Sequence, residues 1–251
     1  MKINGMRIGL YTLSMLAFLP VSGTQADFKT AMDAYKAGSP VAARAVLQNA
    51  STPQEQTLLA HLLLRGFGGE RDIPQGEALL RDAAMAGYAP AQSTLASMLA
   101  TGGVLTKDET AAISWATRAA EQKRPEAMSL LAKLLHDREN TAAAMRWRTA
   151  AAAYGDAAAL IALAKVDQAA GETEPKRLRS AYVRYSLAAA FAAQSYRRTN
   201  SESDALISHE AQAHRASLDL SLTDEQLKLG VEEANAELKA IVGRLRALRA
   251  K

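Results

Sequence analysis

The chain of 251 residues contains no cysteine and few aromatic side chains. Without cysteine, the protein has no disulfide framework, no lipid-modified cysteine and no cysteine nucleophile. Aromatic residues make up 5% of the chain, although 49% of it is hydrophobic. The sequence also lacks β-branched alternating runs of the length of a strand. These absences argue against a β-sandwich or β-barrel and predict an all-α protein packed through small side chains.

Residues 1–26 have the organisation of a secretory signal peptide. Two basic residues, Lys2 and Arg7, precede an apolar segment from Ile8 to Val21, and small residues lead to Ala26. The apolar segment is shorter than the roughly 20 residues that span a membrane as a helix, which disfavours the alternative of an uncleaved anchor. We therefore expect cleavage near Ala26 and a periplasmic or secreted product without a stable membrane anchor.

The net charge is small. It is +4 for the whole chain, and it falls to +2 when residues 1–26 are removed, because that segment carries two basic and no acidic residues. Binding to nucleic acid by electrostatics requires a much larger basic excess. Together with the expected export, this argues against a nucleic-acid partner.

A 36-residue repeat organises the middle of the chain. Residues 60–72 align with residues 96–108, and the same offset relates the later alanine pairs. A fixed period of this size predicts a stacked array of helical hairpins. In each unit, glycines stop a first helix and an aspartate caps a second helix. An alanine pair allows the two helices to approach closely, and a large side chain fills the remaining gap. A glycine in the left-handed conformation ends the unit. The residues that define the repeat in this way are Gly66, Gly68, Gly102, Gly103, Asp72, Asp108, Ala83, Ala84, Ala119, Ala120, Trp115, Trp147, Gly87 and Gly155.

The pattern Ala-x3-Leu-Ala-x2-Leu, glycine-rich loop, Asp, aromatic residue, Ala-Ala and Gly resembles the Sel-one-like repeat (SLR) family, a relative of the tetratricopeptide repeats. A third, shorter copy surrounds Trp147, with its loop contracted to residues 136–140, and a fourth runs from Ala159 to Ala190. Residues 27–50 read as a degenerate opening hairpin. The resemblance implies a right-handed α/α superhelix, or solenoid, of about five hairpins over residues 27–222. The resemblance thus implies a fold and a general manner of function, but it does not imply a substrate.

Residues 223–251 predict one long C-terminal helix, preceded by a polar loop over residues 196–204. Thr223 and Gln226 have the spacing of a capping box. An apolar seam with steps of four and three follows, as in a helix that packs along a partner. Its members are Leu227, Val231, Ala234, Leu238, Ile241, Leu245 and Leu248. The seam could be covered by the array itself or by a second copy. Basic residues crowd the last turns and disfavour a parallel dimer, so we expect a monomer in which this helix caps the array.

The sequence offers no catalytic constellation. His209 and His214 are five residues apart, whereas the zinc-protease motif needs two histidines at i and i+4. No Ser-x-x-Lys motif occurs, because Ser129 and Lys133 are one residue too far apart. The glycines at 66–69 follow a predicted helix rather than a strand, so they do not indicate a nucleotide loop. We therefore expect no enzyme activity, no metal and no cofactor.

The leading hypothesis is a non-catalytic scaffold whose concave face holds a protein partner or a cell-envelope component. The alternative is an accessory subunit of an envelope machine, in polysaccharide secretion or flagellar motor assembly, that docks through the C-terminal helix. On each first helix, the positions opposite the core are candidates for partner binding, with ordinary solvent exposure as the other interpretation. These positions are Thr57, His61, Ser93, Ser97, Ser129, Lys133, Ile161 and Lys165. We also expect Trp115 and Trp147 to be buried between neighbouring hairpins.

Overall fold

The computed structural model describes residues 25–171 and 174–249, and within these ranges it contains α-helices, one short 3-10 helix and no strand. The helices form five consecutive hairpins and two further helices. The hairpins are α1 (Gln25–Lys36) with α2 (Pro40–Val46) and η1 (Leu47–Asn49), α3 (Pro53–Arg65) with α4 (Ile73–Met85), α5 (Ala89–Thr101) with α6 (Glu109–Glu121), α7 (Pro125–Asp137) with α8 (Thr141–Ala152), and α9 (Ala157–Ala170) with α10 (Pro175–Thr199). They are followed by α11 (Glu202–Asp219) and α12 (Asp224–Arg249). The protein is thus an all-α solenoid, as predicted. The expected signal peptide lies almost entirely outside the described residues.

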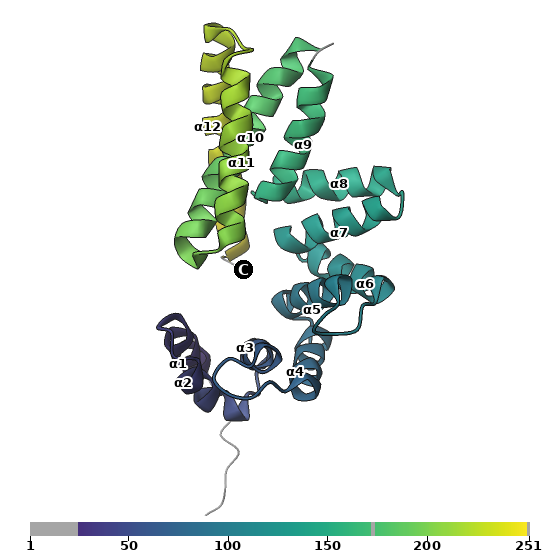
Figure 1. Ribbon diagram of the computed structural model, residues 1–251, viewed down its shortest axis with the longest axis vertical. Coiled ribbons are helices and arrows are strands. Elements are labelled where there is room, and N and C mark those ends of the chain that lie inside the picture. Colours follow the sequence, from purple (N-terminus) through teal and green to yellow (C-terminus); the bar gives the residue numbers. More distant parts are fainter. Residues whose placement is uncertain (1–24, 172–173, 250–251) are drawn as a thin grey trace, which may run out of the picture.

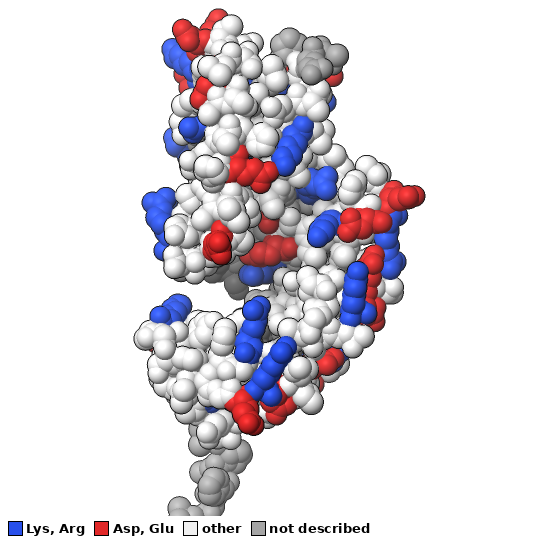
Figure 2. Space-filling view, viewed as in Figure 1, with Lys and Arg blue, Asp and Glu red and all other residues white. Residues whose placement is uncertain are grey.

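The hairpins stack along a curve (Figure 1). Helices α3 and α5 lie on the inner side of this curve, and α4 and α6 lie on the outer side. Helices α9 to α12 form an upright bundle at the C-terminal end, which we call the terminal bundle. The first hairpin and the lower end of the terminal bundle face each other across the open side, where the surface is hollowed (Figure 2).

Caps within the repeat position the second helices. Asp72 accepts a hydrogen bond from the backbone N–H of Gln75, and Asp108 accepts one from that of Ala111, each at 2.9 Å. Each bond satisfies one of the N–H groups that the first turn of a helix leaves free. Both predicted caps are therefore confirmed.

The predicted glycines occupy the turns. Six of them have positive φ, which L-residues with a side chain adopt at a cost: Gly66, Gly68, Gly87, Gly102, Gly103 and Gly155. Gly68 is also a point of close approach, because a Cβ there would lie 2.5 Å from the carbonyl oxygen of Pro40. Its absent side chain lets the loop after α3 touch the start of α2, and so fixes the first hairpin against the second.

The core is continuous from one end of the array to the other. The paired alanines Ala83, Ala84, Ala119 and Ala120 are at most 1% exposed. Three clusters of buried residues follow one another along the chain, and partly buried side chains bridge them: Leu79 joins the first two, and Trp115 joins the second to the third. Since no hairpin buries its apolar face alone, each depends on its neighbours.

The expectation that both tryptophans are buried was wrong. Trp115 and Trp147 are half-buried, although each packs against the core from a second helix. The guanidinium of Arg118 lies 4.7 Å from the centroid of the Trp115 ring, so one face of that indole meets a cation instead of a neighbouring hairpin. The alanine pairs already fill the space between the helices, and the larger indole extends past them toward the surface.

The expectation of a loop at residues 196–204 was also wrong. Helix α10 continues to Thr199, and only Asn200 and Ser201 separate it from α11. Asn200 has a left-handed conformation that ends α10, and the Asp204 carboxylate accepts hydrogen bonds from the hydroxyls of Ser195 and Thr199. The stretch contains neither glycine nor proline. Its polarity marks an exposed helix junction, and α11 was not anticipated.

Helix α12 packs on the array of its own chain. Ile241 is 1% exposed, and Leu227, Leu238 and Leu245 are partly buried against the largest core cluster. Gly230 is buried where a Cβ would lie 2.9 Å from the ring of Tyr182. The capping box is present, since the Thr223 N–H donates to the Gln226 side chain and the Gln226 N–H donates to the Thr223 hydroxyl. One seam residue, Val231, remains 46% exposed.

Candidate interaction surface

The eight predicted partner-binding residues do not form one continuous exposed surface. They lie in pairs on the first helices α3, α5, α7 and α9. Ser97, Lys133 and Lys165 are exposed, whereas Thr57, His61, Ser93 and Ser129 are half-buried. Ile161 is 5% exposed and belongs to the core, so its assignment to a binding surface was wrong.

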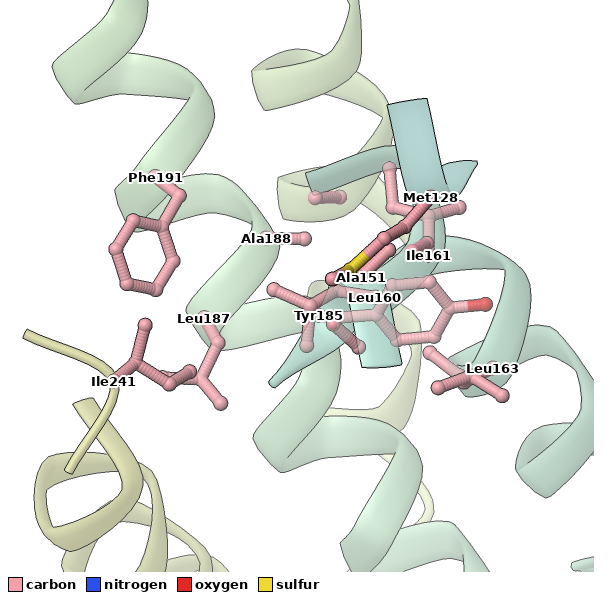
Figure 3. Packing of buried hydrophobic residues seen from close by; sticks show 14 of the residues in the cluster. Met128, Ala151, Leu160, Ile161, Leu163, Tyr185, Leu187, Ala188, Phe191 and Ile241 are labelled. Carbon is pink, nitrogen blue, oxygen red and sulfur yellow. The ribbon is translucent and has the colours of Figure 1, made fainter. Parts of the chain in front are cut away.

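Packing among the last hairpins explains the burial of Ile161. Figure 3 shows Ile161 of α9 beside Met128 of α7, within the cluster that continues into α10 and α12. The fifth hairpin is part of the terminal bundle and packs against α11 and α12, unlike the second and third hairpins. The position that faces away from the core in the earlier copies is therefore covered here.

His61 faces the first hairpin. Its Nε2 lies 3.3 Å from the hydroxyl of Tyr35, and its ring meets the rings of Tyr35 and Phe67 edge-on, with centroids 6.0 and 5.8 Å away. Burial lowers the pKa of His61, and the positive charge of Arg65 lowers it further. The imidazole is therefore neutral in the folded protein near pH 7, and it serves as a contact between hairpins.

Ser129 connects α7 to the next hairpin. Its hydroxyl donates to Oδ1 of Asp156 at 3.0 Å, and the same oxygen accepts from the backbone N–H of Ala159 at 2.8 Å, which caps α9. Burial raises the pKa of Asp156, and these two hydrogen bonds oppose that rise. This position thus has a structural role in the fourth hairpin.

Lys165 of α9 forms an ion pair with α11. Its ammonium lies 2.7 Å from a carboxylate oxygen of Glu210 on α11. Two residues further along α9, the buried carboxylate of Asp167 accepts from Arg177 at 2.8 Å and from Arg184. Burial lowers the pKa of Arg184, as expected when a cation leaves water. The network was not predicted, although a lone Asp on an apolar helix, followed by an arginine-rich and acid-free segment, was a usable signal.

Two glutamines form a second unpredicted link between hairpins. The Gln92 side chain donates to the Ala84 carbonyl at 3.0 Å, and its oxygen accepts from the Gln122 side chain at 2.8 Å. Gln122 also donates to the Gly87 carbonyl at 3.1 Å. The carbonyls at the end of α4 and in the turn after it are thus bonded by side chains of the next hairpin.

The described residues include no cluster of three or more potential metal ligands among His, Asp and Glu. His209 is exposed, while His214 stacks on the Tyr185 ring at 5.0 Å between centroids, so the two imidazoles have different environments. Within the described ranges, no helix has the length and apolar character needed to cross a membrane. Ser97 and Lys133 remain as exposed polar residues of the predicted set without an ion pair to another helix in the described chain.

Comparison with known proteins gives structural relatives only. No family model matches the sequence, and no curated protein matches it. A Sel1 repeat protein from Oxalobacter formigenes is similar in structure, with a TM-score of 0.61, 21% identity and coverage of 86% of each chain. The second structure is c5321, a protective antigen present in uropathogenic Escherichia coli strains that displays an SLR fold, with a TM-score of 0.56 and 20% identity.

The second alignment covers 90% of this chain, which spans 56% of the length of that antigen. The first is described as a Sel1 repeat protein and the second as an SLR fold, and each alignment covers most of this chain. The chain therefore has the SLR fold, which its repeat motifs resemble.

Proposed function

We propose that the protein is a non-catalytic scaffold that holds a protein partner, or a cell-envelope component, along its first helices. The observation that carries this proposal is the exposure of Ser97 on α5 and Lys133 on α7, at corresponding positions of a curved array. Stacked helical repeats present extended concave surfaces, and binding there requires no rearrangement of the core.

We propose further that the scaffold acts outside the cytoplasm. The support is the basic, apolar and small-residue organisation of residues 1–26. N-terminal sequencing of protein recovered from the periplasm or medium is expected to begin close to Asp27. Recovery of the intact N-terminus from the cytoplasmic fraction would contradict export and leave the scaffold proposal unaffected.

In-cell photo-crosslinking tests the binding surface. A crosslinker at position 97 is expected to capture a partner that one at Arg146, an exposed position on α8, does not capture. The partner is identified by mass spectrometry, and its affinity is then measured for the Lys133→Glu variant and for the Arg146→Glu variant, which has the same change of charge. Loss of an interfacial charge pair predicts a roughly tenfold weaker affinity for Lys133→Glu alone. Equal affinities for the two variants would exclude this face.

A second candidate is an accessory subunit of an envelope machine that docks through α12. The favouring observation is that Leu229 and Val231 of this helix are 40% and 46% exposed. Replacing both with Gln leaves the buried side of α12 intact. If this double variant loses the partner and Lys133→Glu retains it, docking through α12 replaces the first-helix surface as the proposed mode.

A further inference from the structure

The lower end of the terminal bundle encloses a groove against one edge of the array. The groove has a volume of about 690 Å³. One wall consists of the turn between α6 and α7, residues 122–126, and the turn between α8 and α9, residues 154–158. The other wall consists of the last turns of α10, the first turns of α11 and the last turns of α12. Helix α10 has 25 residues and α6 has 13, so the extra turns of α10 supply part of this wall.

Apolar side chains cover much of the groove. Phe191 lines it from α10 and Ile207 from α11, and the contribution of α12 includes Val242, Leu245 and Leu248. Ile207 and Leu245 pack against the main core and are only partly buried, so part of their apolar surface remains open. A partner that covers this surface gains the usual free energy of apolar burial.

The acidic side chains of the groove have partners within the described chain, whereas two of its basic side chains do not. Its carboxylates are all engaged: Glu126 lies 3.4 Å from Arg124, Asp156 accepts from Ser129, and Asp204 accepts from the Ser195 hydroxyl at 2.7 Å. The exposed side chains of Lys123 and Arg246 make no ion pair or hydrogen bond with the rest of the described chain. After these internal contacts, the groove offers a partner two cations around an apolar floor.

We propose that this groove binds a short extended segment of a partner protein, in which acidic residues flank a large apolar side chain. The acidic residues complement Lys123 and Arg246, and the apolar side chain covers the partly buried Ile207 and Leu245. The volume is within the range of about 300–1,000 Å³ that holds a compact ligand, and it is too small for the long trough that an amphipathic helix requires. Binding of such a segment rests on the proposed scaffold function and specifies the chemistry of the partner.

Fluorescence anisotropy with labelled synthetic hexapeptides tests the proposal on the full chain. The probe is Glu-Asp-Leu-Phe-Asp-Glu, and the control peptide is Lys-Lys-Leu-Phe-Lys-Lys. We expect binding of the acidic peptide only, and an affinity about tenfold lower for the double variant Lys123→Glu, Arg246→Glu. The matched variant is Arg146→Glu, Lys239→Glu, which changes the net charge equally at exposed positions outside the groove. It is expected to bind as the unmodified protein does.

Equal binding of the two peptides, or equal effects of the two double variants, would overturn the proposal. So would binding to phosphatidylglycerol vesicles that is lost in the groove variant while the acidic peptide does not bind, because the cations would then serve a membrane surface. If the groove variant still captures the partner crosslinked at position 97, a negative peptide result refutes the groove alone. The scaffold proposal is refuted separately, by the absence of any specific crosslink.

Discussion

Replacing Ile241 with alanine tests whether α12 depends on the array for its place. Ile241 is the seam residue that is most deeply buried, at 1% exposure, and it packs against the cluster that contains Leu187 of α10 (Figure 3). Removing three carbon atoms from such a site costs the transfer free energy of those atoms and leaves a cavity. The two contributions together amount to about 2–5 kcal/mol for a buried isoleucine.

Val231→Ala is the matched control on the same helix. Val231 is 46% exposed, so its replacement is expected to change the free energy of unfolding by less than about 0.5 kcal/mol. Both substitutions replace a β-branched residue with alanine and give a similar small gain in helix propensity. The difference between the variants therefore reports the packing of Ile241.

Chemical denaturation followed by far-ultraviolet circular dichroism measures both variants, and thermal melts provide a second measurement. In a chain of this size, about 1 kcal/mol corresponds to a shift of roughly 2–4 °C in Tm. We expect a Tm several degrees lower for Ile241→Ala and nearly unchanged for Val231→Ala. Equal, small effects of the two substitutions would refute the docking of α12 on its own array.

Two further predictions concern a turn and a histidine. Gly68→Ala is expected to destabilise the protein more than Gly38→Ala. Both glycines have positive φ, but only at position 68 does an added Cβ meet the carbonyl of Pro40. Similar losses of stability for the two variants in denaturant titrations would contradict this contact. The lowered pKa of His61 means that the unfolded chain takes up a proton near pH 6.5 that the folded chain does not, so stability from this residue is present above that pH and is lost as the pH falls. The free energy of unfolding should then fall less between pH 8 and pH 5 in His61→Gln than in the unmodified protein, and identical pH profiles would exclude the effect.

Features that depend on a single turn of chain could be predicted from the sequence. Asp72 and Asp108 cap helices through N–H groups three residues away, so the residue type and its spacing contain the whole interaction. The left-handed Gly87 is predictable for the same reason. One local signal was overlooked: Thr52 and Glu55 form a capping box before α3, and their Thr-x-x-Glu spacing is present in the sequence.

Features that depend on contacts between distant segments could not be predicted in the same way. The repeat register predicts that Ile161 faces away from the core, but it contains no information on the cluster with Met128 and α10 that buries this side chain. The half-burial of Trp115 depends on how closely the alanine pairs bring the helices together. For the candidate groove, the repeats predict the turns of one wall, while the other wall requires α11, which the polar stretch at 196–204 concealed.

The hydrogen bond from Arg244 to the carbonyl of Ala153, at 2.7 Å, joins residues 91 positions apart. A simple repeat array, in which each unit touches only its neighbours, loses its end units one at a time. Here the last helix returns to the turn after the fourth hairpin, so the C-terminal end cannot fray without releasing a contact in the interior of the array. We therefore expect the opening of α12 to be coupled to the junction of α8 and α9. Within the described chain, the first hairpins make no hydrogen bond with the C-terminal helices, so we expect their amides to exchange with solvent through smaller, independent openings.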